Sequence, residues 1–327
     1  MTQQQYVLSP DHDAHIASAI GKFFRRIIPM LALMLIVNQI DRANIGFVKA
    51  ELQTDAGISA AAFGLGAGLF FIGYALFEVP SNMMLKKLGA RVWLTRIMIT
   101  WGMVVVLTGF VSTPLHFYLL RFLLGVAEAG FFPGVLFYFR QWVPNAWRGR
   151  ATAMVLSATA SAFLFSGPLT GAILMMHDVG GIAGWKWVMF VEGGGSMVIG
   201  LLAAFVLVSK PQGAKWLSDA EKQALAQQLA LEDDAREEHA VKHGRWGLIS
   251  DRSLLSYCLI FFTMTMTGYT LVFWLPQIIQ RIQGFNSFET GLLTAVPWLF
   301  AIVALFLLGK ATDRYRDNWT KGSASPC

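Results

Sequence analysis

Residues 117–139 read FYLLRFLLGVAEAGFFPGVLFYF, and Arg121 and Glu128 are the only charged side chains in this run. A helix of about 20 mostly apolar residues is long enough to cross a lipid bilayer. The whole chain shares this character, because 55% of its 327 residues are hydrophobic and 14% are charged, against about 25% charged in a typical globular domain. This composition excludes a soluble enzyme, a disordered chain and a disulfide scaffold, and it predicts an all-α membrane protein.

Further apolar runs of similar length occur at 27–47, 63–85, 92–112, 151–176, 187–208, 253–276 and 290–311, which predicts eight spans in all. The polar segment 209–251 predicts an amphipathic helix, with a weak apolar stripe formed by Leu217, Ala220, Ala224 and Leu225. We therefore expect a six-span bundle over 1–208, an amphipathic linker over 209–251, and a region over 252–327 that holds the first two spans of a second bundle and a short polar tail.

Basic residues lie in short clusters between the apolar runs, and most of them fall in the loops on one side of the predicted bundle. That side holds Lys22, Arg25, Arg26, Lys86, Lys87, Arg91, Arg140, Arg148, Arg150, Lys310, Arg314, Arg316 and Lys321, and the other holds Lys49, Lys186 and Arg281. Short loops rich in Lys and Arg remain in the cytoplasm. The pattern predicts a cytoplasmic N-terminus, linker and tail. It also explains the net charge of +6, so we expect a lipid bilayer and not a nucleic acid as the partner.

A faint repeat relates two basic turns, each of which follows the second span of a half. The first reads SNMMLKKLGAR (81–91) and the second reads GKATDRYRD (309–317). Parallel repeats of this kind build one large class of secondary transporters.

Charged side chains inside predicted spans point to function, because each costs at least ~2.5–3.5 kcal/mol to insert into a membrane. The first span carries Asp41, Arg42 and Asn44, the second carries Tyr74, and the fourth carries Arg121 and Glu128. A guanidinium matches a carboxylate with two parallel hydrogen bonds, so Arg42 or Arg121 could receive an anionic substrate. A carboxylate in a partly dehydrated cavity can hold a proton near neutral pH, which makes Asp41 and Glu128 candidate proton carriers.

An alternative is that Asp41–Arg42 and Arg121–Glu128 are ion pairs that only hold helices together. Arg121 and Glu128 lie about two turns apart on one helix face, with Gly125 between them leaving room for a ligand or a close neighbour. Small residues four apart at 64–68, 130–134 and 167–171 favour close helix packing. The chain carries no nucleophile or metal motif of a hydrolase, and we expect neither an enzyme nor a bound cofactor.

Several longer strings together resemble one transporter family. They are DRANIGF (41–47), FFIGYALFEVPSN (70–82), LGARVWLTRIMITWG (88–102), RFLLGVAEAGFFPGVLFYFRQWVPNAWRGRA (121–151), GWKWVMFVEG (184–193) and FWLPQII (273–279). They are similar to the anion:cation symporters of the major facilitator superfamily, whose members carry tartrate-, phthalate-, sugar-acid- and hydroxyphenylacetate-like carboxylates.

The resemblance implies proton-coupled symport of a small organic carboxylate across the cytoplasmic (inner or plasma) membrane by alternating access. It assigns proton coupling to Asp41 and Glu128. Substrate contact is assigned to Arg42, Asn44, Tyr74, Arg121, Tyr269, Trp274 and Gln277. It also implies a gating turn that keeps Lys87, Gly89 and Arg91, with Asp313 and Arg314 in its second copy.

One departure from the family pattern is length, since the family has twelve spans and this chain predicts eight. The chain is therefore expected to be a C-terminally truncated form of the pattern. A truncated membrane protein that does not transport, or a sensor that uses the same anion pocket, is the alternative to a symporter. A channel is less favoured, because the sequence shows no repeated ring of polar pore residues.

Overall fold

The computed structural model describes residues 10–238, 252–281 and 285–322, and the side chains of 11–234, 252–281 and 285–304. Helices make up the regular structure of these ranges, and the predicted all-α class is confirmed. They are α1 (Pro10–Arg26), α2 (Ile28–Phe47), α3 (Lys49–Asp55), α4 (Ala60–Leu88), α5 (Ala90–Thr108), α6 (Pro114–Glu128), α7 (Phe131–Trp142), α8 (Asn145–Leu174), α9 (Gly184–Val206), α10 (Asp219–Glu238), α11 (Arg252–Gln280) and α12 (Ser287–Gly322), with short 3₁₀ turns η1 (Val179–Gly181) and η2 (Pro211–Gly213).

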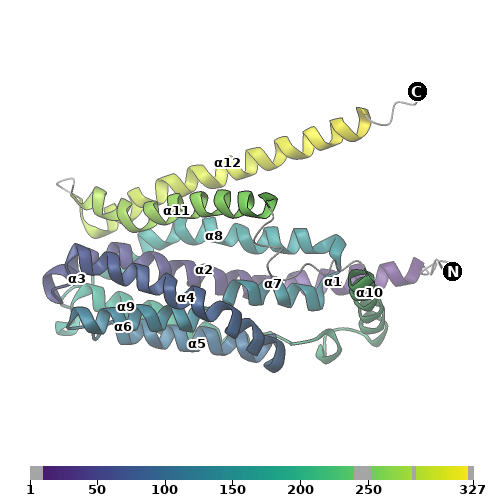
Figure 1. The fold of residues 1–327 in the computed structure, drawn as a ribbon, viewed down its shortest axis with the longest axis horizontal. Coiled ribbons are helices and arrows are strands. Elements are labelled where there is room, and N and C mark those ends of the chain that lie inside the picture. The colour runs from purple at the N-terminus through teal and green to yellow at the C-terminus, as the bar shows by residue number, and fades with distance from the viewer. Residues whose placement is uncertain (1–9, 239–251, 282–284, 323–327) are drawn as a thin grey trace.

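The long helices lie side by side in one bundle (Figure 1). Helix α3 lies at one end of the bundle, and α1 and α10 lie toward the other. Helices α11 and α12 run along one side, where α11 contacts α2 and α12 contacts α8.

Within the described ranges, seven helical stretches are long and apolar enough to cross a membrane. They correspond to seven of the eight predicted spans. The exception is the first predicted span, 27–47, which contains α2. Helix α2 is 20 residues long, but Asn38, Asp41, Arg42 and Asn44 lower its hydropathy. It packs against α8, α9 and α11 inside the bundle, and its crossing of the membrane remains a prediction.

The predicted fourth span is broken in the middle. Helix α6 ends at Glu128, and Gly130 adopts φ = 83°, a left-handed conformation that glycine accepts at little cost. The hydroxyl of Ser81 donates to the freed Ala129 carbonyl at 2.6 Å and accepts from Trp93 Nε1 at 2.9 Å. This break places the Glu128 side chain at a helix end inside the bundle.

Small residues bring α8 and α12 into backbone contact. A Cβ atom added to Gly167 would lie 2.3 Å from the Gly291 carbonyl oxygen, so neither position has room for a larger side chain. The packing role predicted for 167–171 is confirmed at this contact. The prediction is wrong at Gly64 and Gly68, which have no neighbour within 4 Å at the Cβ position.

Helix α10 begins at a reciprocal capping box within the sequence SDAE. The Glu221 backbone amide donates to Ser218 Oγ at 3.2 Å, and the Ser218 amide donates to Glu221 Oε2 at 2.7 Å. The same carboxylate accepts from Lys22 Nζ at 2.7 Å and from Ser18 Oγ at 2.7 Å, both on α1. Glu221 therefore starts α10 and fixes it to α1.

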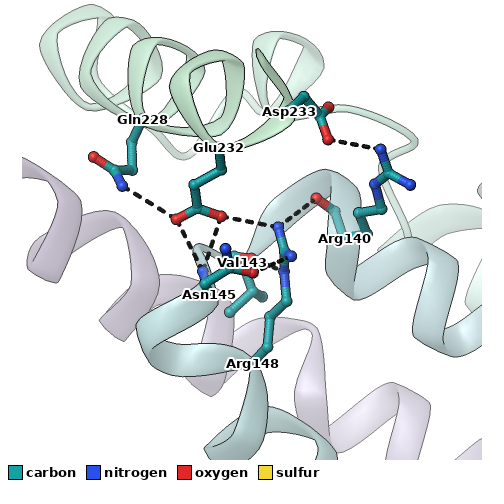
Figure 2. A network of polar contacts seen from close by, with 7 residues as sticks. All are labelled: Arg140, Val143, Asn145, Arg148, Gln228, Glu232 and Asp233. Atoms are coloured by element: carbon teal, nitrogen blue, oxygen red, sulfur yellow. Dashed lines mark hydrogen bonds and ion pairs between the residues drawn. The ribbon is translucent and has the colours of Figure 1, made fainter. Parts of the chain in front are cut away.

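A second polar network joins α10 to the turn between α7 and α8 (Figure 2). Glu232 accepts from the Asn145 backbone amide at 3.0 Å and from Arg148 Nη2 at 3.1 Å. Asp233 accepts from Arg140 Nη2 at 2.7 Å. Helix α10 is thus held to the first six spans at two points.

The predicted apolar stripe of the linker is only partly correct. Ala224 and Leu225 are buried on α10. Leu217 is also buried but precedes the helix, because Ser218 is the capping residue, and Ala220 is exposed to solvent. Residues 239–251 of the predicted linker lie outside the described ranges, and the domain boundaries remain predictions.

The Glu221 contact predicts a dependence of stability on pH. Burial alone would raise the pKa of Glu221, but hydrogen bonds from Lys22, Ser18 and the Ser218 amide lower it from 4.5 to about 2. A carboxyl with a lowered pKa stabilises the fold above its unfolded value, and the contribution is lost as pH falls through the folded value. We expect Glu221→Gln to lower the free energy of unfolding by about 1 kcal/mol at pH 7, and the difference from wild type to disappear between pH 4.5 and 2.

Thermal unfolding in detergent across this pH range measures the effect. The control is Lys222→Gln, since Lys222 pairs with Asp219, whose side chain is 95% exposed, and it should change little. A difference between Glu221→Gln and wild type that is the same at pH 7 and pH 2 would contradict the assignment.

Candidate functional site

The site is centred on Glu128 at the end of α6, whose side chain has no solvent exposure. Its Oε2 accepts from Asn38 Nδ2 at 2.9 Å and from Arg42 Nε at 2.8 Å, both on α2. Its Oε1 is buried without a hydrogen-bond partner among the described residues. A buried carboxylate is stable only when it is paired or protonated, so Arg42 decides the charge state of this site.

Arg42, which lies on α2, also connects Glu128 to α11 and α4. Its Nη1 donates to the Tyr269 hydroxyl of α11 at 2.8 Å. Its guanidinium carbon lies 5.0 Å from the centre of the Tyr74 ring and 5.4 Å from that of Phe70, both on α4. The Arg42 side chain is 14% exposed, so the pair reaches the edge of the protein interior.

Arg121 lies next to this pair without joining it. The residue is 4% exposed, and its guanidinium carbon is 5.1 Å from the centre of the same Phe70 ring. Its Nε has no hydrogen-bond partner, and no described carboxylate forms an ion pair with it. Two guanidinium groups thus lie near one aromatic ring, and among the described side chains only Arg42 is paired with a carboxylate.

The ion pairs considered from the sequence do not form among the described side chains. Arg42 pairs with Glu128 instead of Asp41, and Arg121 forms no ion pair with a described carboxylate. Gly125 does not leave room for a ligand, because a Cβ there would lie 2.0 Å from the Phe70 carbonyl oxygen. Helix α6 is therefore packed against α4 at Gly125, and Glu128 is reached from α2.

A second polar group lies between α2, α5, α8 and α9. Asp41 Oδ2 accepts from Trp101 Nε1 at 2.7 Å and from Ser196 Oγ. Glu192 accepts from Asn44 Nδ2 and Thr170 Oγ1, each at 2.8 Å. The structure thus brings the predicted Asn44 to a carboxylate and not to the Arg42 group.

Neither carboxylate of this group has a cationic partner among the described residues, although Asp41 is 1% exposed and Glu192 is 6% exposed. An unpaired buried charge costs several kcal/mol, which the neutral acid avoids. Ser196 lies one turn after Glu192, and its single hydroxyl proton can be donated to Asp41 Oδ2 or to the Glu192 backbone carbonyl oxygen at 3.0 Å. The geometry suits a pair of acids that holds protons.

Sequence reasoning missed Glu192 and Asn38. Glu192 is a charged residue inside the predicted span 187–208, so the insertion cost that identified Glu128 would have identified it too. Asn38 lies one turn before Arg42 on α2, and its role depends on α6 packing against that face. No sequence signal marks that packing.

Of the three predicted residues on α11, only Tyr269 reaches the Arg42 group. Gln277 Oε1 accepts from Lys49 Nζ at 2.6 Å, and Trp274 holds the same ammonium 3.8 Å from the centre of its ring. Lys49 is buried at the start of α3. These contacts tie α11 to α3 at that end of the bundle.

The predicted gating turn lies at the opposite end. Gly89 takes φ = 84° between α4 and α5, Lys87 is exposed, and Arg91 Nε donates to the Ala204 carbonyl at 2.6 Å. The side chains of Asp313 and Arg314 lie outside the described part of α12. No cluster of three or more His, Cys, Asp or Glu that could hold a metal occurs among the described residues.

The Glu192 contacts predict how substitutions act. Glu192→Leu should lower the free energy of unfolding by about 2–3 kcal/mol, because Asn44 and Thr170 lose their buried partner. Glu192→Gln keeps a carbonyl oxygen for Thr170 and resembles the neutral acid, so it should cost less than half as much. Thermal unfolding in detergent compares the two, and equal losses in both variants would contradict a neutral Glu192.

Comparisons with known proteins agree with this architecture. The family model described as Major Facilitator Superfamily matches residues 31–324. A protein named "Putative tartrate transporter" from Agrobacterium vitis is 40% identical over 300 residues, which are 91% of this chain and 66% of that protein. A quinolone resistance transporter from Acinetobacter baumannii is 40% identical over 294 residues, 90% of this chain and 68% of its own length.

The chain thus spans about two thirds of the length of these relatives. A solved structure of a D-xylose-proton symporter is similar in fold, with a TM-score of 0.67 at 14% identity over 89% of this chain and 70% of that one.

Proposed function

Because the chain belongs to the major facilitator superfamily, we propose that it acts as a secondary transporter that moves an organic carboxylate together with protons across the cytoplasmic membrane by alternating access. The superfamily consists of multi-pass membrane transporters and not of enzymes. In this proposal the end with α1 and α10 faces the cytoplasm, as the distribution of basic residues predicts. The names of the relatives differ in substrate, so the substrate class is argued from the site.

The observation that carries the proposal is the unpaired Arg121 beside the Arg42–Glu128 pair. An unpaired guanidinium that is 4% exposed needs an anion, since burial of a lone charge is costly. A substrate carboxylate supplies two oxygen atoms for the two parallel N–H donors of a guanidinium. We therefore assign the substrate carboxylate to Arg121, with Arg42 as the second cation.

Counting charges favours a dicarboxylate with one proton. Arg42 and Arg121 contribute +2 and ionised Glu128 contributes −1, so the empty group is +1. A dianion would make it −1, and protonation of Glu128 would then return it to zero. A neutral loaded group is the least costly to bury when the cavity closes. A tartrate-like dicarboxylate, as in the name of one relative, satisfies this count.

Glu128 and the substrate compete for one guanidinium, which links proton binding to substrate binding. Arg42 holds Glu128 through Nε and Tyr269 through Nη1. A proton on Glu128 removes its charge and weakens its hold on Arg42, which can then turn toward the substrate. By linkage, the substrate strengthens proton binding by the same factor. Asp41 and Glu192, on the other face of α2, form a second pair of carboxyl groups that can bind protons.

Alternating access is supported by where α11 and α12 contact the first six spans. Close backbone contacts join Gly46 to Val272, Gly167 to Gly291 and Gly171 to Ser287. Lys49 bonds Gln277 toward α3. Toward the α1 end, the residues of α11 from 252 to 264 are exposed in the described structure. We propose that this arrangement is the cytoplasm-facing state of the transport cycle.

Replacing Arg121 by Lys tests the carboxylate assignment. We expect tartrate binding, measured by calorimetry in detergent, to weaken about tenfold, because an ammonium cannot form the two-pronged hydrogen bond. Arg96→Lys is the matched control, since Arg96 lies on α5 and stacks on Trp93 at 4.3 Å. An unchanged affinity in Arg121→Lys would move the carboxylate contact to another residue.

Replacing Glu128 by Gln tests the proton linkage. In the wild-type protein, tartrate should bind up to tenfold more tightly for each unit of falling pH while one linked proton is taken up. Glu128→Gln imitates the protonated acid, so its affinity should be high and nearly independent of pH. In proteoliposomes it should still exchange tartrate but should not accumulate it in response to a pH gradient.

Two results would contradict this account. A pH dependence that survives in Glu128→Gln would place the linked proton elsewhere, with Asp41 and Glu192 as the next residues to test. Tartrate binding without exchange in the wild-type chain would favour the alternative of an anion sensor over a transporter.

A further inference from the structure

A cavity of about 630 Å³ opens where α9 ends, at the same end of the bundle as α1 and α10. Its lining includes three basic residues from separate segments: Arg26 in the last turn of α1, Arg91 in the first turn of α5, and Lys215 after η2. All three side chains are exposed, and none of the described residues that line the cavity carries a carboxylate. The cavity lies well away from Arg42 and Glu128 along α2, and the proposed transport site does not use it.

Among the described side chains, these three cations lack the carboxylate partners that Lys22, Arg140 and Arg148 have. Arg26 lies 5.8 Å from the centre of the Trp216 ring, and Arg91 donates Nε to the Ala204 carbonyl. No ion pair is formed by either of them, or by Lys215, among the described residues. By contrast Lys22, Arg140 and Arg148 at the same end are all paired with carboxylates. Three like charges around one hollow attract an anion strongly.

The surroundings of the cavity indicate that this anion is attached to lipid. Phe205, which lines the cavity, is 83% exposed, and it continues a stripe of exposed apolar residues on the spanning helix α9: Val198, Leu201 and Leu202. Their spacing of three and four residues places them on one face of the helix. The cations therefore lie at the end of a surface suited to an acyl chain.

Trp216 adds a further interfacial feature. It is partly buried, stacks on Trp142 with ring centres 5.5 Å apart, and lines the cavity beside Arg26. Tryptophan is enriched at the depth of lipid headgroups, where its ring is apolar and its N–H is polar. The end of the apolar stripe, an aromatic ring and three cations thus line one cavity, which suits the acyl, interfacial and phosphate parts of a phospholipid.

We propose that this cavity binds the headgroup phosphate of an anionic phospholipid, with Arg26, Arg91 and Lys215 as the phosphate ligands and the Phe205 stripe as the acyl surface. Basic pockets between spanning helices are suited to such headgroups. The bound lipid contacts α1, α5, the end of α9 and the segment before α10 together. It thereby joins the predicted gating turn at Arg91 to the linker, at a cavity that no described acidic residue lines.

The test is lipid binding to the full 327-residue chain in detergent, measured by native mass spectrometry with added phosphatidylglycerol, cardiolipin or phosphatidylcholine. The variant is Arg26→Gln with Lys215→Gln, which leaves the Arg91 bond to Ala204 intact. The matched control is Arg25→Gln with Lys210→Gln. Both residues are exposed neighbours that do not line the cavity, and replacing them removes the same amount of positive charge.

We expect the anionic lipids to bind more tightly than phosphatidylcholine. The variant should weaken anionic binding about 25-fold, since each cation near the surface contributes roughly a factor of five, and the control should change it by less than threefold. A third variant, Phe205→Ser, should weaken the diacyl lipid but leave the weak binding of inorganic phosphate unchanged.

Three outcomes would overturn the proposal. Equal losses in the variant and the control would mean that surface charge alone attracts the lipid. No preference for anionic lipids in the wild-type chain would remove the headgroup assignment. Inorganic phosphate that binds as tightly as the diacyl lipid and displaces it would make the cavity a site for a soluble phosphate compound.

Discussion

The ion pair between Glu128 and Arg42 is the interaction on which the rest of the site depends. Glu128 has no solvent exposure, and its helix ends at that residue because Gly130 takes a left-handed turn. The carboxylate therefore cannot reach water and must be held by α2 or be neutral. Arg42 meets this need and also contacts α4 and α11. The Arg42–Glu128 ion pair thus brings four helices together: α2, α4, α6 and α11.

Helix α2 separates two acidic groups that are compensated in different ways. Glu128 is held by a cation, whereas Asp41 and Glu192 are held by neutral donors from Trp101, Ser196, Asn44 and Thr170. A carboxylate with only neutral partners gains less from ionising than one beside a guanidinium. A movement of α2 therefore alters the surroundings of both groups.

Much of this could be predicted from sequence because inserting a charge into a membrane is costly wherever it occurs. That rule identified Asp41, Arg42, Arg121 and Glu128, and the apolar runs identified the helices. It could not identify partners, because Arg121 and Glu128 share a helix face but the contact at Gly125 turns that face toward α4. Which side chains form ion pairs depends on which helices are adjacent. Helix packing in turn depends on small residues and helix breaks, whose effect appears only in the three-dimensional structure.

The contact between Arg42 and Tyr269 connects the site to the packing of α11 on α2. It joins α2 of the first six spans to α11, in a region where the remaining close contacts between these parts lie toward α3. An anion that draws Arg42 away from Glu128 also changes its bond to Tyr269, since one guanidinium makes both. In the proposed function, binding at the site would therefore be coupled to the way α11 lies on α2, which is the coupling that a transporter needs to expose one site alternately to each side of the membrane.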